Sequence, residues 1–442
     1  MPDSNSSRLK ELRLRERLAW LLGTRRGRLW LAGGSLAVLV AVGLGAYFYE
    51  KDRTGSIYPH PDARFVPQTT PKPPVRGPEA FAWPLYGYTK DHLRYFAAPP
   101  SLGPPFRERW VRSEGSLLEF PPVIYGERIF QLADDGVLAA INKTTGHFDW
   151  VRKLGTSSAS TPAVNATTVY ATLFSRESGS EEAGRVVALN VANGHVIWSR
   201  NLPSASESSP LLDSGKLFFG SQDGTVYALN ARTGATLWTY HAEGAVKASP
   251  SLKNGILYFG DYSGNLQAVS ERTGRRIWRS GSEGALVGSG TFYSTSAVAY
   301  GRVYLGNTDG RIYAYDQRTG SLDWAVQTGA YVYASPAVAN APRLGPTIYL
   351  GSYDGNFYAL NARTGHIDWS YDAHGRISGS ATIVGSIVYF SALGTHTATG
   401  LNITSGRRVF TDEGSFDPVI TDGRDIFLTG YNTLHALEPI HH

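Results

Sequence analysis

The sequence predicts an all-β fold: an eight-bladed β-propeller of four-stranded antiparallel blades, preceded by a single transmembrane helix. Three observations predict the propeller. A tryptophan pattern recurs every 40 to 48 residues, tight-turn dipeptides divide each repeat into short β-rich runs, and an unmatched outer strand before the first repeat complements an incomplete blade at the end. The propeller is assigned to residues 105–439.

Composition agrees with this fold and excludes several kinds of site. The 442 residues include 49 Gly, 25 Tyr and 10 Trp, a combination that favours many short strands joined by tight turns. There is no cysteine, which excludes disulfides, thiolate zinc sites and cysteine nucleophiles. Eight basic residues precede the first apolar run, and the rest of the chain carries 34 basic and 34 acidic residues. Nucleic acid is therefore not a predicted partner.

An uncharged run at residues 29–49 predicts a membrane-spanning helix. Its 21 residues would extend about 30 Å, enough to cross the core of a bilayer. Because the segment 1–28 is basic, we expect it to be cytoplasmic, with the propeller outside a cell membrane that the chain crosses once. The alternative is a cleaved signal peptide, but residues 46–50 offer no small-x-small cleavage site.

Three further features flank or lie within this helix. Small residues recur every fourth position and would allow a homodimer, although such residues are common in membrane helices in any case: Gly33, Ala37, Ala41 and Gly45. Residues 50–80 are rich in proline and predict an extended extracytoplasmic linker. Residues 81–104 are aromatic and too apolar for a free linker, so we expect them to pack on the propeller.

The repeat itself is read from its tryptophans. Six copies share an Ala, a Gly and a closing Trp, and five of the six have an Asn or Asp two residues after the Ala; a seventh copy ends in Phe410 instead. The six copies end at Trp150, Trp198, Trp238, Trp278, Trp324 and Trp369. Successive aromatic positions are separated by 48, 40, 40, 46, 45 and 41 residues, which is the period of a four-stranded propeller blade.

Turn chemistry resolves the unit 247–279 into four strands. Small residues at 248–252 predict an inner strand, and the Asn254-Gly255 turn leads into the β-rich run 256–259. A second turn at Ser263-Gly264 leads to 266–269, and a third delivers 276–278 as the outer strand. Small residues suit the crowded axis, whereas the wide gap between outer strands needs a large side chain. Burying an aromatic there would contribute on the order of 4 to 6 kcal/mol before entropy is charged.

The two ends of the chain complete one blade. Residues 106–110 form an outer-strand pattern with no blade before it, and they supply a seventh structural tryptophan, Trp110. At the other end, residues 416–420, 426–429 and 433–437 predict three strands with no outer strand after them. Joining the two sets gives an eighth blade and removes both exposed sheet edges.

The repeated pattern A-x-[N/D]-x-x-T-G-x-x-x-W resembles the tryptophan-docking motif of the quinoprotein (PQQ) propeller family. The resemblance extends from Trp83 to about Pro439, and it implies a fold more specifically than a function. The family includes PQQ-dependent alcohol and glucose dehydrogenases, and also non-catalytic members such as the outer-membrane assembly factor BamB and extracytoplasmic sensor domains.

The preferred interpretation is a non-enzymatic, membrane-anchored scaffold or ligand-binding module of the cell envelope. A PQQ-dependent dehydrogenase is the alternative, and a glycan or small-ligand sensor is a third. For the dehydrogenase alternative, the resemblance implies a calcium-bound quinone, a carboxylate base and, in alcohol oxidisers, an adjacent-cysteine disulfide. It places none of these on residues of this sequence, and the disulfide is impossible without cysteine. We therefore predict no catalytic residue, cofactor or metal. His147, His195 and His366 occupy equivalent turn positions, so repetition explains them better than metal binding.

Repeat alignment places one residue in each of seven blades at the mouth of the central channel, three positions before the inner-strand proline position. This set is Glu119, Ala159, Glu207, Lys247, Tyr293, Tyr333 and Ser378. With two neighbouring aromatic residues, the candidate binding residues are Glu119, Glu207, Lys247, Phe292, Tyr293, Tyr331 and Tyr333. Longer loops at 175–184 and 280–290 should lie on the same face. Exposed aromatics beside a cation suit a peptide, a glycan or another envelope protein. The alternative is that the tyrosines only plug the channel.

Overall fold

The computed structural model describes residues 39–45, 64–68, 81–175, 183–284, 288–414 and 419–440. Of the predicted membrane span, only a helix at residues 39–45 is among them. In these ranges no helix is long and apolar enough to cross a membrane. The basic segment, most of the proline-rich linker, Gly33 and Ala37 lie outside them. The anchor, its topology and the homodimer therefore stay predictions.

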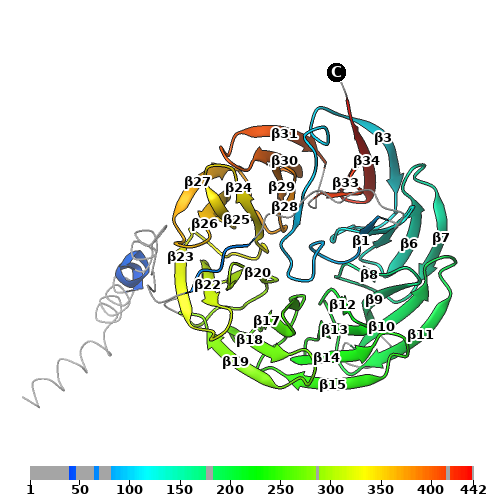
Figure 1. Cartoon of the computed structure of the whole chain (residues 1–442), viewed down its shortest axis with the longest axis horizontal. Coiled ribbons are helices and arrows are strands. Elements are labelled where there is room, and N and C mark those ends of the chain that lie inside the picture. The colour runs from blue at the N-terminus through cyan, green and yellow to red at the C-terminus, as the bar shows by residue number, and fades with distance from the viewer. Residues whose placement is uncertain are drawn as a thin grey trace, which may run out of the picture. The chain divides into compact units, whose positions relative to one another are not determined.

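Eight antiparallel sheets follow one another around a ring in chain order (Figure 1). Blade 1 contains β4 Val123–Tyr125, β5 Arg128–Leu132, β6 Val137–Asn142 and β7 Phe148–Lys153. Blade 2 contains β8 Ala163–Val164, β9 Thr168–Ser175, β10 Ala183–Asn190 and β11 Val196–Leu202. Blade 3 contains β12 Leu211–Asp213, β13 Lys216–Gly220, β14 Thr225–Asn230 and β15 Thr236–His241. Blade 4 contains β16 Ser251–Lys253, β17 Ile256–Gly260, β18 Asn265–Ser270 and β19 Arg276–Gly281.

The remaining blades repeat this order. Blade 5 contains β20 Ala297–Ala299, β21 Arg302–Gly306, β22 Arg311–Asp316 and β23 Leu322–Gln327. Blade 6 contains β24 Ala337–Ala341, β25 Gly345–Gly351, β26 Asn356–Asn361 and β27 Ile367–Asp372. Blade 7 contains β28 Thr382–Val384, β29 Ile387–Ala392, β30 Thr397–Asn402 and β31 Arg408–Glu413. Blade 8 contains β32 Ile420–Thr421, β33 Ile426–Thr429, β34 Thr433–Pro439 and, from the N-terminal side, β3 Phe106–Ser113.

The predicted eight-blade closure is confirmed. Strand β3 pairs antiparallel with β34, and Trp110 lies opposite Ala436. Arg109 supports this joint through an ion pair, at 2.6 Å, with the buried Asp425, which directly precedes β33. Of the predicted inner strand 416–420, residues 416–418 lie outside the described part of the chain. The four strands of blade 4 match the predicted unit, except that the inner strand begins only after Pro250, which has no N–H to donate.

Each structural tryptophan spans the junction to the next blade. Its indole N–H donates to a backbone carbonyl of the next blade at 2.9 to 3.3 Å, as Trp198 does to Ala231. The ring lies over the glycine of the same turn: a Cβ on Gly234 would come within 2.7 Å of the Trp198 ring. That glycine also has a positive φ of 73°. The turn therefore needs Gly both for its backbone conformation and to make room for the ring.

An axial strap, residues 81–98, lines the inside of the ring. It contains β1 Ala82–Trp83, which extends the sheet of blade 1, and β2 Tyr95–Phe96, which runs parallel to β28. Its carbonyls also accept from inner-strand amides, as Leu252 N–H donates to Lys90 at 2.7 Å and Val298 N–H to Asp91 at 2.9 Å. The aromatic segment thus packs inside the propeller.

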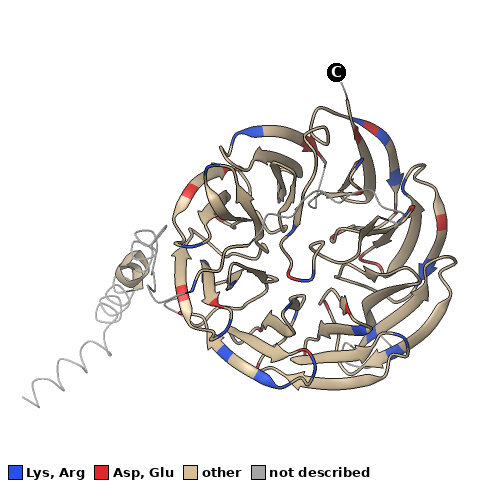
Figure 2. Cartoon of the chain, viewed as in Figure 1, with Lys and Arg blue, Asp and Glu red and all other residues tan. Residues whose placement is uncertain are grey.

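The four-stranded meander defines two faces of the propeller. Turns between the first and second strands, and between the third and fourth, lie at one end of the strands, here called the turn face. Connections between blades and turns between the second and third strands lie at the other end, the channel-mouth face. Residues 64–68 dock on the turn face, where Val66 N–H donates to Tyr300 and Phe65 stacks on the Tyr300 ring at 5.2 Å. Charges of both signs are scattered around the outer strands (Figure 2).

Candidate binding site at the channel mouth

A cavity of about 250 Å³, here called the channel-mouth cavity, lies where the inner strands of six blades begin. Its walls come from the connections before β4, β12, β16, β20, β24 and β28, together with the turns at Tyr353 and Leu393. Tyr86 of the axial strap also lines it and donates or accepts a hydrogen bond with Ser380 Oγ at 2.8 Å. The cavity is therefore bounded by the strap as well as by the blades.

Hydroxyl groups link neighbouring blades beneath the cavity. The backbone N–H of Thr295 donates to Ser335 Oγ at 3.0 Å, and that of Ser335 donates to Ser380 Oγ at 3.0 Å. The Ser249 and Thr161 amides make the same kind of bond to their neighbouring blades. Small hydroxyl side chains at the axis therefore supply hydrogen bonds between blades, besides fitting the limited space there.

One wall of the cavity is acidic. Glu207 accepts from Lys247 Nζ at 2.6 Å and from Gln222 at 2.7 Å, and the Tyr293 hydroxyl donates to its other oxygen at 3.4 Å. Desolvation, reinforced by Glu207, raises the pKa of Glu119. Among the described contacts Lys247 is committed to Glu207, so Glu119 is left with no cationic partner in the cavity.

The opposite wall is a row of tyrosine rings. Tyr333 lies at its centre, 5.7 Å from Tyr293, 4.9 Å from Tyr353 and 6.0 Å from Tyr331, measured between ring centroids. Tyr262 extends the row behind Tyr293 and carries Lys247 over its ring at 5.1 Å. Burial, followed by the nearby Glu207 carboxylate, raises the pKa of Tyr293, so its hydroxyl stays protonated and acts as a donor.

Of the predicted binding residues, five line this cavity together: Glu119, Glu207, Lys247, Tyr293 and Tyr333. Tyr331 lies outside the lining, with 53% of its surface exposed, and contacts it through Tyr333. Phe292 was expected at the rim, but its side chain is fully buried and this expectation is wrong.

Phe292 is buried because adjacent residues of an extended segment point to opposite sides. Its side chain fills the space above Gly260 of the preceding blade, where a Cβ would lie 2.2 Å from the Cβ of Phe292 and 3.0 Å from its ring. Val246 over Gly220 and Ile377 over Gly351 repeat this contact. The apolar residue before each mouth position is therefore a packing residue.

Three tyrosines of this site were not predicted from the sequence: Tyr262, Tyr353 and, on the axial strap, Tyr86. Tyr262 and Tyr353 each stand directly before the turn dipeptide of their blade, Ser263-Gly264 and Asp354-Gly355. Aligning the repeats on those dipeptides would have placed both on the channel-mouth face. Nothing in the repeat could have placed Tyr86, because the strap is not part of it. The loops 175–184 and 280–290 do connect strands on this face, but residues 176–182 and 285–287 lie outside the described ranges.

The cavity residues do not fit a calcium-bound quinone. PQQ carries three carboxyl groups, yet the cavity presents two carboxylates and one lysine that is already paired. Within the described ranges, no three His, Cys, Asp or Glu side chains are grouped so that they could hold a metal ion. His147, His195 and His366 lie in separate blades, on the turns that precede the outer strands.

Solved structures share the fold at low sequence identity. BamB from Moraxella catarrhalis is 16% identical with a TM-score of 0.62, covering 76% of this chain and 100% of that chain. A europium-containing methanol dehydrogenase is 13% identical with a TM-score of 0.67, covering 82% and 98%. The quinohemoprotein alcohol dehydrogenase from Comamonas testosteroni is 13% identical with a TM-score of 0.64, covering 82% and 81%. These likenesses show the fold alone.

No curated protein sequence matches the chain. The sequence family described as outer membrane protein assembly factor BamB matches it in three overlapping stretches, residues 107–280, 182–332 and 222–440. Together these stretches contain all eight blades and most of the chain. The chain therefore belongs to this BamB family of quinoprotein-like propellers.

Proposed function

We propose that this protein is a non-enzymatic binding module of the cell envelope that receives a segment of a partner protein in the channel-mouth cavity. The observation that carries the proposal is the composition of that cavity, a tyrosine wall facing two carboxylates. Its membership of the BamB family supports a role in protein interaction. The N-terminal apolar run would hold the propeller at the outer surface of a membrane.

The chemistry of the walls favours a basic side chain as the inserted group. An arginine or lysine would pair with Glu119 and lie against the rings of Tyr333 and Tyr353. Arg376 already lies over the Tyr353 ring at 5.8 Å, which is the same kind of contact made within the chain. The tyrosine hydroxyls and serines around the mouth would bind the partner's backbone.

Co-purification of a partner protein tests the binding. Full-length protein is isolated from the cells that make it, as the parent, as Tyr333→Ala with Glu119→Gln, and as Ile277→Ala, a change on an exposed outer strand far from the cavity. We expect a co-purifying protein that the double variant loses and the Ile277 variant keeps. A partner retained by all three proteins would contradict the use of this cavity.

The dehydrogenase alternative is tested separately by titrating the full-length protein with PQQ and calcium. We expect no saturable change in quinone absorbance and no dye-linked oxidation of alcohols or sugars, because the cavity lacks the positive charge needed for a tricarboxylate. Micromolar quinone binding accompanied by turnover would overturn the non-enzymatic proposal.

A further inference from the structure

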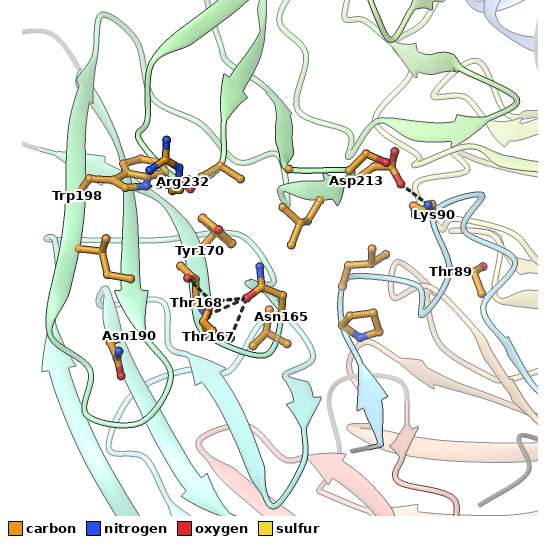
Figure 3. Close-up of a pocket in the computed structure, with 18 of the residues that line it drawn as sticks. Thr89, Lys90, Asn165, Thr167, Thr168, Tyr170, Asn190, Trp198, Asp213 and Arg232 are labelled. Atoms are coloured by element: carbon orange, nitrogen blue, oxygen red, sulfur yellow. Dashed lines mark hydrogen bonds and ion pairs between the residues drawn. The ribbon is translucent and has the colours of Figure 1, made fainter. Parts of the chain in front are cut away.

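A second and larger cavity, of about 820 Å³, lies on the turn face between blades 2 and 3 and one side of the axial strap. We call it the strap-gap cavity (Figure 3). Figure 3 shows Lys90 of the strap reaching to Asp213 on one side, with Trp198 and Arg232 on the other and Tyr170 between them. Its volume is within the range of ligand-binding pockets, about 300 to 1,000 Å³.

The gap arises because the strap bypasses blade 3. Inner-strand amides of five blades donate to strap carbonyls at equivalent positions: Val164, Leu252, Val298, Val338 and Ile383. In blade 3 the equivalent residue is Leu212, and none of the described strap carbonyls accepts from its amide. Between blades 2 and 4 the strap instead turns on itself, with Tyr88 N–H donating to Leu85 and Arg94 N–H donating to Gly87.

Side-chain burial shows the same difference. The residue at this inner-strand position is at most 7% exposed in the other seven blades, from Ile124 in blade 1 to Thr421 in blade 8. Leu212 alone is only partly buried among the described blades. Blade 3 therefore presents both a free inner edge and an incompletely covered apolar side chain to the same cavity.

We propose that the strap-gap cavity binds an extended peptide of a partner protein, which adds to the free edge of β12 as the strap adds to the other blades. The peptide supplies a carbonyl to the Leu212 amide, the bond that the strap makes in five other blades. An apolar side chain of the peptide packs on Ile197 and the Trp198 ring, both of which line the cavity.

The charges at the mouth specify the peptide further. Arg232 is exposed and makes no ion pair within the described part of the chain, whereas Lys90 and Asp213 neutralise each other. An acidic residue beside the apolar one would pair with Arg232. The expected ligand is thus an extended, acidic and apolar segment, opposite in charge to the group proposed for the channel-mouth cavity.

The free edge can be tested without a ligand. In the full-length protein, we expect the Leu212 amide to exchange its hydrogen at least about tenfold faster than the matched Leu252 amide of blade 4, which is bonded to Lys90. Hydrogen exchange followed by NMR measures both. Equal exchange rates would overturn the gap and with it the proposal.

Binding is tested with a phage-displayed library of linear heptapeptides selected on the full-length protein. We expect enriched peptides that combine acidic and apolar residues, that slow exchange of the Leu212 amide, and that lose at least about tenfold in affinity on Ile197→Asp. Ile277→Asp is the matched control, since Ile277 is the equivalent residue of blade 4 and is 48% exposed against 50% for Ile197.

Arg232→Ser tests how much the charge of Arg232 contributes to peptide binding, separately from the free edge of β12. It should weaken binding severalfold at low salt and much less at high salt, because an exposed ion pair is screened. No enrichment, enrichment of peptides that bind both isoleucine variants equally, or binding that leaves Leu212 exchange unchanged would each overturn the proposal. Circular dichroism of each variant checks that it is folded.

Discussion

Two kinds of blade junction differ in how they are held. Seven junctions use a tryptophan that docks on the turn between the third and fourth strands of the next blade. The junction between blades 7 and 8 uses Phe410, which packs edge-to-face on Phe106 and Tyr389 at 5.5 and 5.7 Å. Blade 8 has no such turn, because its third strand ends the propeller and its fourth strand comes from the N-terminal side. The tryptophan motif therefore belongs to junctions rather than to single blades.

Removing the closing strand should have the largest effect on this comparison. Deleting residues 105–112 exposes an edge of β34 and removes Trp110, although blades 1–7 remain complete. We expect aggregation or melting at least about 10 °C below the parent. Scanning calorimetry measures this. A deletion variant that melts like the parent would mean that the ring closes without β3.

Truncating a docking residue should cost more at a tryptophan junction than at the closing junction. Trp324 is 1% exposed, and Trp324→Ala should lower the free energy of unfolding by about 3 to 5 kcal/mol. Phe410 is only partly buried, and its side chain has no N–H to donate. Phe410→Ala should therefore lower the free energy of unfolding by at least about 1 kcal/mol less than Trp324→Ala does. Urea unfolding compares them, and equal losses would remove the distinction.

Substituting the turn glycine should destabilise the protein nearly as much as removing the tryptophan ring that lies over it. A Cβ on Gly365 would approach the Trp324 ring within 2.9 Å, and φ there is +74°. Gly365→Ala should therefore destabilise by about 2 to 3 kcal/mol. Gly414, with φ +87° and no atom near its Cβ position, reports the backbone strain alone, and Gly414→Ala should cost about 1 kcal/mol. Similar losses would show that the ring contact is unimportant.

Placing a tryptophan at position 410, in the junction between blades 7 and 8, should not stabilise the protein. Phe410→Trp finds no turn carbonyl to accept its N–H, so its unfolding free energy should change by less than about 1 kcal/mol or fall. A clear gain in stability would show that the junction between blades 7 and 8 does contain a docking position.

The smallest expected effect is on how stability depends on pH, and it involves Glu114, which directly follows β3 of blade 8. Burial, reinforced by Asp135 and opposed by Arg112, raises the pKa of Glu114 to about 7 from its ordinary 4.5. The folded protein therefore binds a proton that the unfolded chain releases, and stability falls as pH rises through this window. Glu114→Gln should flatten that part of the melting profile between pH 5 and about 7.5. The exposed Glu127→Gln serves as control, and identical profiles would contradict the role of Glu114.

The sequence by itself determined the ring. Asp-Gly and Asn-Gly turns, the spacing of the tryptophans and the unmatched strand before Trp110 are local signals, because turn conformation and strand alternation depend on nearest neighbours. Repeat alignment also brought Glu119, Glu207, Lys247, Tyr293 and Tyr333 to one face, since equivalent positions in a closed ring point to the same axis.

Only the tertiary structure decided what fills that axis. The strap has no repeat, and its path depends on which inner-strand amides its carbonyls reach, so neither Tyr86 beneath the channel mouth nor the gap at Leu212 could be found by alignment. The burial of the Phe292 side chain likewise depended on the space left by Gly260 in another blade. Such contacts join residues from different blades or from outside the repeat, and their energies come from packing and hydrogen bonds that no local pattern encodes.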